Sequence, residues 1–363
     1  MAATAIAQED GSRIGNPSDA SSTSIISSTS SASDELGTCC EGSDSAISSE
    51  SRLGGIDMLY IDTRGIFHLQ AENGQVGTQF LADHLNLNIR GHINDRIDFR
   101  LRQRLNKKVF DENYVFNATD FLYINWQATD RWSFRMGKDA VLIGGYEYDA
   151  VPIDVYFYSK FCNSINQGFT FGASTAFKVK EGQTLAFQVC TSPLSYGYQG
   201  VYAYNLAWMG HITPIWNTIW TFNMVQDMDG RFINYIALGN HFQWDNFLFD
   251  LDFMNRAAFQ QRQFFLSDYT FIVKTIWTVG KWNICFKGGY ERNSARNVDK
   301  DGRPFDNVIA PGTKYLYAGA GLEYFPLGND KVRLHAVYYR DNFISRDNFD
   351  VGVTWRIDII KPQ

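Results

Sequence analysis

Six histidines and one closely spaced pair of acids are the residues whose types could support catalysis. Asp250 and Asp252 are two positions apart and could divide the roles of acid and base. In a strand, however, this spacing places both carboxylates on one polar face, which needs no catalytic explanation. No recognisable nucleophile motif accompanies the histidines, and covalent catalysis would require one. The histidines are His68, His84, His92, His211, His241 and His335. The sequence therefore favours a non-enzymatic protein without catalytic residues.

The five cysteines do not have the spacing of a metal site or of a disulfide framework. Cys39 and Cys40 are adjacent, whereas Cys162, Cys190 and Cys285 are scattered along the chain. We therefore expect neither a bound metal nor a cofactor.

The net charge of −6 is confined to the N-terminal segment. Residues 1–55 contain two basic and eight acidic residues, and residues 56–363 contain 31 of each kind. This balanced remainder lacks the basic field that nucleic-acid binding requires. Residues 11–55 are rich in Ser and poor in apolar side chains, which predicts disorder. Because the sequence AIAQ at residues 5–8 matches a small-x-small cleavage pattern, we interpret 1–55 as a signal remnant followed by a disordered acidic tail.

The elements that must position the polar side chains show a repeat of two residues. In the sequence IDFRLRQR, apolar Ile97, Phe99 and Leu101 alternate with charged residues that include Arg100 and Arg102. A helix would scatter these side chains around its axis, whereas a strand separates them onto two faces. The same alternation recurs to the end of the chain and predicts β-strands.

Sixteen such segments follow one another, and their connections alternate between short and mostly longer ones. The longest connection is 139–167, and 292–312 is also long. Tryptophans flank several of the short connections, as in the aromatic girdle of a membrane barrel. The predicted strands are 57–69, 79–91, 96–105, 118–127, 131–138, 168–177, 183–191, 202–211, 216–226, 231–242, 246–256, 268–279, 281–291, 313–324, 331–341 and 348–359. A soluble antiparallel sandwich also fits the alternation, but it would have turns of mixed length at both ends.

Composition agrees with a membrane barrel. The chain is 45% hydrophobic and 15% aromatic, yet its mean hydropathy is only −0.26 because a barrel strand exposes every second residue to lipid. No run of about 18 apolar residues predicts a membrane-spanning helix. We therefore predict an all-β fold, a transmembrane antiparallel β-barrel of about 16 strands. An even strand number places both termini on the side of the short turns, the periplasmic side in a Gram-negative outer membrane.

A barrel of sixteen strands leaves a water-filled channel along its axis. The apolar connection 139–167 is expected to fold toward the channel and narrow it, with Gly144-Gly145 and Pro152 supplying bends. By alternation, basic side chains of four strands line the lumen near this loop, and the loop contributes Glu147, Asp149 and Asp154. The pore-lining residues predicted in this way are Arg64, Arg100, Arg102, Arg135, Arg356, Glu147, Asp149 and Asp154. Either the basic wall and the acidic loop create a transverse field, or the arginines pair with neighbours such as Asp62 and Asp98.

Three segments carry a family resemblance: FRLRQRLN, NWQATDRWSFRMGK and, above all, GGYEYDAVPIDVY. Over residues 56–363 the sequence resembles outer-membrane porins of the phosphate-selective porin O/P-like superfamily. The resemblance implies sixteen strands, a third loop folded into the channel, a homotrimer, and a basic residue at the constriction, here Lys138. Loop 139–167 offers few basic residues against acids that include Glu147, Asp149 and Asp154, so the sequence does not support phosphate selectivity.

The expected function is passive diffusion of small hydrophilic solutes or ions across the outer membrane. Its partners are then outer-membrane lipid, the permeating solute and, by the resemblance, two further copies of the chain. Two other functions stay open. The first is a structural or adhesive barrel with an occluded lumen, and the second is a barrel enzyme. Single-channel conductance in planar bilayers is expected to separate all three functions, since a stable ionic conductance supports the pore.

Overall fold

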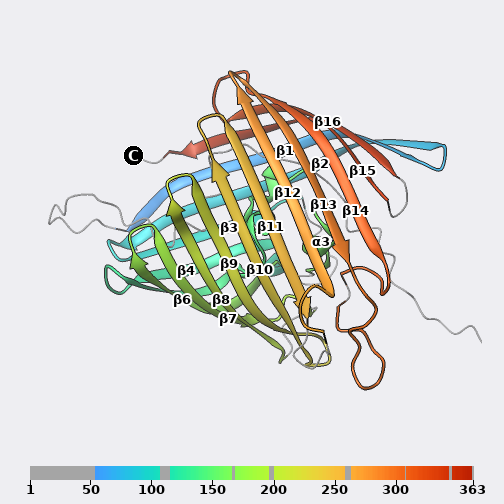
Figure 1. Cartoon of the computed structure of the whole chain (residues 1–363). Coiled ribbons are helices and arrows are strands. Elements are labelled where there is room, and N and C mark those ends of the chain that lie inside the picture. Colours follow the sequence, from blue (N-terminus) through green and yellow to red (C-terminus); the bar gives the residue numbers. More distant parts are fainter. Residues whose placement is uncertain are drawn as a thin grey trace, which may run out of the picture.

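The protein folds into one closed antiparallel β-barrel of sixteen strands (Figure 1). The computed structural model describes residues 54–106, 115–165, 168–195, 200–257, 263–306, 308–342 and 346–361. Each strand pairs with its neighbour in sequence, and β1 pairs with β16 to close the barrel. The prediction of an all-β, sixteen-stranded barrel is confirmed. The predicted N-terminal tail lies outside the described residues, apart from its last two positions.

The strands are long and their bounds follow the predicted segments closely. They are β1 (Gly55–Glu72), β2 (Gln75–Asn94), β3 (Ile97–Arg104), β4 (Thr119–Gln127), β5 (Trp132–Ala140), β6 (Phe169–Lys180), β7 (Gln183–Thr191), β8 (Tyr202–Thr213), β9 (Trp216–Gln226), β10 (Phe232–Gln243), β11 (Phe247–Ala257), β12 (Asp268–Val279), β13 (Trp282–Arg292), β14 (Lys314–Tyr324), β15 (Val332–Asp341) and β16 (Asp347–Ile360). The described short helical segments are η2 (Val115–Ala118), α2 (Tyr146–Asp149), η3 (Pro152–Asp154) and α3 (Lys160–Ser164).

Alternation along each strand separates an outer apolar face from an inner polar one. On β3, Arg100 and Arg102 are buried inside the barrel. On the neighbouring strand β4, Leu122 and Ile124 are 43% and 52% exposed on the outer face. An outer face that is apolar and exposed all round is the surface that a lipid bilayer covers. Within the described residues, no helix is long and apolar enough to cross a membrane.

Tryptophans gather on the outer face beside the short turns, as the sequence predicted. Trp126 and Trp132 flank the β4–β5 turn, and Trp277 and Trp282 flank the β12–β13 turn; all four are 42% to 50% exposed. Trp244 lies in the β10–β11 turn and is 43% exposed. Exposed indole rings at one level around a barrel are typical of a membrane interface.

The first hairpin differs from the prediction. Residues 70–78 were expected to form a longer connection, but β1 and β2 continue to a two-residue turn at Asn73 and Gly74. Both turn residues have positive φ, 50° and 80°, which is the conformation that Asn-Gly favours in a type I′ hairpin. The hairpin therefore protrudes beyond the other strands at the end opposite the C-terminus (Figure 1).

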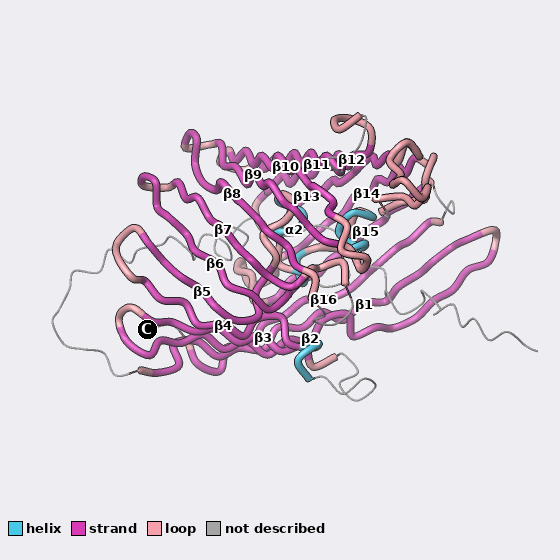
Figure 2. The backbone as a smooth tube through the Cα atoms, turned by 90° about the horizontal axis from the view of Figure 1, so that it is seen from below, coloured by secondary structure: helices cyan, strands magenta, loops and turns pink. Residues whose placement is uncertain are grey.

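Inside the barrel, the β5–β6 loop lies across the ring of strands, with α2 drawn within it (Figure 2). Its apolar residues Val141, Ile143 and Phe161 pack with inner side chains of β8 to β12, such as Ala203 and Met254. The apolar content of this loop is thus buried against the inner wall and not left in water.

Candidate functional site: the inner wall and the β5–β6 loop

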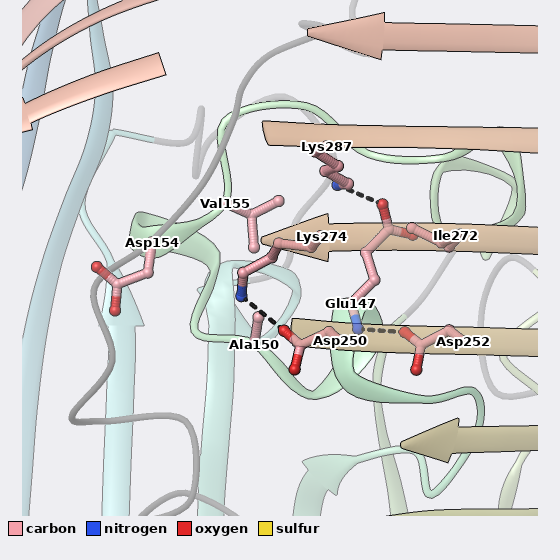
Figure 3. Close-up of a pocket in the computed structure, with 9 residues that line it drawn as sticks. All are labelled: Glu147, Ala150, Asp154, Val155, Asp250, Asp252, Ile272, Lys274 and Lys287. Carbon is pink, nitrogen blue, oxygen red and sulfur yellow. Dashed lines mark hydrogen bonds and ion pairs between the residues drawn. The ribbon is translucent and has the colours of Figure 1, made fainter. Parts of the chain in front are cut away.

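The β5–β6 loop is attached to the inner wall first through Asp252 on β11. The Asp252 carboxylate accepts hydrogen bonds from the backbone N–H groups of Tyr146 (2.9 Å) and Glu147 (2.8 Å), at the start of α2 (Figure 3). Gly145 makes this approach feasible, because a Cβ there would lie 2.3 Å from an Asp252 oxygen. The glycine pair predicted to supply bends thus also supplies room for the anchor.

A buried ion pair forms the second attachment. Glu147 lies 2.5 Å from the ammonium of Lys287 on β13, and both side chains are almost fully buried. The Glu147 carboxylate also accepts hydrogen bonds from Ser159 and from the Cys162 thiol. Burial raises the pKa of Glu147, but the Lys287 charge and these hydrogen bonds outweigh it, so the net shift is downward. Glu147 is therefore ionised and holds two parts of the loop to one wall.

The far side of the loop reaches β15 and β1. Asp154 lies 3.0 Å from Arg333 on β15. Arg64 on β1 is fully buried and donates to the carbonyl oxygens of Ile153 and Val155, both at 2.9 Å. The loop therefore spans the interior from its own strand β5 to the opposite side of the barrel.

The returning part of the loop is held by acids of the same wall. The Glu291 carboxylate on β13 accepts from the backbone N–H groups of Lys160 (2.6 Å) and Phe161 (3.1 Å), at the start of α3. The Tyr156 hydroxyl donates to Glu323 on β14 at 2.9 Å. A small cavity remains between the loop and the wall, lined by residues that include Asp250, Lys274 and Glu147 (Figure 3).

The inner face of β3 and β4 carries the second half of the site, a set of arginines stacked on aromatic rings. Arg102 and Arg104 both bond to Asp120, with nitrogen–oxygen distances of 3.0 and 2.7 Å. The guanidinium carbon of Arg100 lies 3.9 Å from the Phe121 ring centroid, and that of Arg102 lies 4.5 Å from it. Cation–π contacts fix the guanidinium planes without neutralising their charge. Two guanidinium groups therefore share the Asp120 carboxylate on this part of the wall.

Arg135 and Lys138 on β5 have different surroundings. Arg135 lies inside, 2.7 Å from Asp139 and stacked 4.1 Å from the Tyr123 ring centroid. Lys138 pairs in register with Leu122 and Phe171, which are both 43% exposed on the outer face.

The expectation that Lys138 lines the constriction is therefore wrong in this structure. Cross-strand partners share a face of the sheet, so the Lys138 side chain starts on the outer side. It is 3% exposed, and its ammonium donates to the carbonyl oxygen of Phe116 at 2.5 Å under that ring. The correction follows from the alternation of the strand, because Lys138 lies three positions after Arg135 and an odd spacing changes the face.

Other predicted positions also differ in their setting. Glu147 does not face the basic wall, since it is paired with Lys287, and Asp154 is paired with Arg333. Arg356 on β16 stacks 4.4 Å from the Tyr60 ring centroid but is exposed, at the short-turn end of the barrel and away from the loop. Asp149, the last residue of α2, is partly buried.

Three residues that hold the loop were not singled out from the sequence as loop contacts: Asp252, Lys287 and Arg333. Alternation places each of them on the inner face, and that is the only signal the sequence contains. The partner of each depends on the path of a loop that lies more than 100 residues away in the chain.

The barrel has sixteen strands and is closed, its outer face is apolar and carries a Trp girdle, and a loop crosses its charged interior. These features define the class of the protein as an outer-membrane porin, a non-enzymatic channel. Residues 65–218 match the family described as phosphate-selective porin O and P. The resemblance found in the sequence is thereby confirmed over these residues. None of the curated proteins matches the chain.

Solved structures show the same fold at low sequence identity. The outer membrane channel DcaP of Acinetobacter baumannii is similar with a TM-score of 0.59 and 11% identity, over 84% of this chain and 98% of that one. OmpT of Vibrio cholerae, folded in vitro, is similar with a TM-score of 0.58 and 10% identity, over 86% of this chain and 100% of that one. A trimer form of OmpT is similar with a TM-score of 0.53 and 11% identity, over 84% of this chain and 100% of that one.

Proposed function

We propose that this porin passes small hydrophilic solutes between the β5–β6 loop and the inner face of β3 and β4, with a preference for small anions. The observation that carries the preference is the sharing of Asp120 by Arg102 and Arg104, with Arg100 beside them on the same face. In a narrow passage such charges act on a permeating ion more strongly than in bulk water.

The loop supports this location for the passage. Four of its anchors, Asp252, Lys287, Glu291 and Arg333, belong to β11 to β15, and Arg64 of β1 holds its far side. The loop therefore lies mainly against that wall, and the solute path proposed here runs between the loop and the arginines of β3. In this arrangement Glu147 and Asp154 are paired with Lys287 and Arg333, so the arginines of β3 supply the charge that is proposed to act on the solute.

The proposal is tested by reconstituting the purified protein in planar bilayers under a salt gradient. We expect stable single-channel steps in KCl and a reversal potential of the sign for chloride preference. Replacing chloride by phosphate at equal ionic strength then tests whether phosphate is favoured over other anions. A reversal potential of the sign for potassium would overturn the anion preference. The absence of any step would favour a barrel with an occluded lumen.

We further propose a homotrimer with both termini in the periplasm. The trimer form of Vibrio cholerae OmpT supports the assembly. The short turns and the C-terminal end of β16 lie at one end of the barrel (Figure 1), and the tryptophans of the girdle flank these turns. Both observations support periplasmic termini. Crosslinking in intact outer membranes tests the trimer, since a monomer would yield no crosslinked species.

A further inference from the structure

Basic side chains gather on the outer face of the barrel at the loop end of β13, β14 and β15. Arg292 ends β13 and pairs in register with Lys314, the first residue of β14. Lys314 alternates with Leu316, which is 53% exposed to the lipid side. Arg340 on β15 follows Tyr338 by two positions, and Tyr338 is 45% exposed. The strands β13, β14 and β15 are neighbours in the barrel (Figure 1), so all three cations belong to one sector of the lipid-facing surface.

Aromatic rings fix the level of these cations in the membrane. Tyr290 precedes Arg292 by two residues on the same outer face, as Tyr338 precedes Arg340. Tyrosine rings on the outer face of a barrel mark the boundary between hydrocarbon and headgroups. Two residues along a strand advance about 6.6 Å, so each guanidinium group starts beyond its tyrosine ring, toward the lipid headgroups. Arg340 pairs in register with Ala318, four residues from Lys314 along β14, so it starts about 13 Å from Lys314 in the strand direction.

The cluster is confined to these strands, and few carboxylates neutralise its positive charge. Arg340 pairs with Asp347 at 3.3 Å. For Arg292 and Lys314, no carboxylate among the described residues lies within salt-bridge distance. On β6 to β8, by contrast, the outer positions at the loop end are uncharged: Phe169, Phe171, Val189, Thr191, Tyr202 and Tyr204. One sector of the barrel therefore carries a net positive charge at headgroup level.

We propose that Arg292, Lys314 and Arg340 bind the phosphate groups of a phosphorylated glycolipid in the leaflet at the loop end of the barrel. Basic residues at a membrane surface attract anionic headgroups, and a guanidinium can donate two parallel hydrogen bonds to one phosphate. A headgroup with two phosphates matches a cluster whose cations lie on three adjacent strands. The proposal rests on the proposed orientation, in which this leaflet is the outer one, and is independent of the solute that the channel passes.

The test compares two double variants of equal charge change in the full-length protein. Arg292→Gln/Lys314→Gln removes two charges from the cluster, and Arg296→Gln/Lys300→Gln removes two from the nearby exposed loop. Binding of lipid A with two phosphates, of dephosphorylated lipid A and of phosphatidylglycerol is measured by native mass spectrometry in detergent. Inorganic phosphate is added as a competitor, which separates a headgroup site from a site for the free ion.

We expect wild type and the loop variant to prefer lipid A with two phosphates, and the cluster variant to bind it on the order of 10-fold more weakly. Arg292→Lys/Lys314→Arg keeps both charges and should keep the binding, which excludes a general folding defect. Equal binding of phosphorylated and dephosphorylated lipid A, equal loss in both double variants, or a preference for phosphatidylglycerol would each overturn the proposal. Displacement by inorganic phosphate at equal concentration would also overturn it. Conductance should be unchanged in the cluster variant, so failure here leaves the channel function intact.

Discussion

At the scale of single residues, the charge on the inner face of β3 controls the proposed ion preference. We predict that replacing Arg100 and Arg102 by Ser shifts selectivity toward cations, because the substitutions remove two fixed positive charges from the wall of the passage. The shift should shrink in 1 M salt, where charges are screened within about 3 Å. The reversal potential in a KCl gradient measures it.

The chain offers a matched control on β5. Arg135→Gln removes an inner charge and leaves Asp139 facing the passage, whereas Lys138→Gln removes a charge from the outer side. Only the first should move the reversal potential toward cation preference. A shift of equal size in Lys138→Gln would show that the face assigned to Lys138 is incorrect.

The Glu147–Lys287 pair gives the loop a pH dependence. Because the folded state lowers the pKa of Glu147, the pair stabilises the loop above the ordinary carboxyl pKa of about 4.3. This contribution is lost as the pH falls through the lowered value, so acid should loosen the loop. We predict that single-channel current noise rises below about pH 4 in the wild type.

Glu147→Gln provides the comparison, since it cannot form the ion pair at any pH. The variant should be noisier than the wild type at neutral pH and should lose most of the acid-dependent increase. Identical pH profiles for the two proteins would mean that other carboxylates release the loop.

At the scale of elements, two loops at the same end of the barrel are joined by ion pairs between two copies of one sequence motif. We call this pair of contacts the clasp. Residues 227–231 (DMDGR) and 299–303 (DKDGR) share the pattern Asp-x-Asp-Gly-Arg. Arg231 reaches Asp299 at 2.8 Å, and Arg303 reaches Asp229 at 2.7 Å. Desolvation raises the pKa of Asp299, but hydrogen bonds from two backbone N–H groups and from Arg231 outweigh it and lower the pKa to about 2.

We predict that Arg231→Gln opens this clasp. Arg231 is 17% exposed and contacts Asp227 as well as Asp299, whereas Arg303 is 50% exposed. Cleavage by the protease Lys-C after Lys300 should therefore accelerate on the order of 3-fold in Arg231→Gln, and less in Arg303→Gln, because exposed ion pairs contribute little. Equal rates in all three proteins would show that the clasp does not restrain the loop.

At the scale of the whole molecule, the arrangement of turns and loops predicts the orientation in the membrane. An epitope tag inserted within 292–312 should be labelled on intact cells, because that connection belongs to the long-loop end. A tag at the β4–β5 turn, near residues 128–130, should be labelled only after the outer membrane is opened. The reverse pattern would invert the proposed orientation and place the termini outside.

The N-terminal segment gives a second prediction at this scale. Deleting residues 11–50 should leave a barrel that still migrates in a heat-dependent manner on gels, because its Ser-rich composition has few apolar side chains to bury. Loss of this behaviour would show that the segment contributes to folding. The same variant in a bilayer tests whether the segment restricts the conductance.

The sequence by itself determined the strands and the face of almost every side chain in them. Alternation is a local property, so the inner positions of Arg100 and Arg102 and the outer positions of Phe99 and Leu101 follow from their spacing. The same reasoning places Lys138 outside, and the expectation that it lines the constriction came instead from the family resemblance. The Asn73-Gly74 turn could also have been predicted from the sequence, since that pair favours a two-residue hairpin.

Only the tertiary structure decided where the β5–β6 loop lies and what holds it. Glu147 meets Lys287, and Asp252 meets the start of α2, across more than 100 residues of chain. Alternation places several other acids and bases on the inner face, and any of them could have paired with the loop. The choice among them depends on the closed ring of strands, which brings β5 opposite β13 and β15, and such closure is a property of the whole sheet that no local spacing contains.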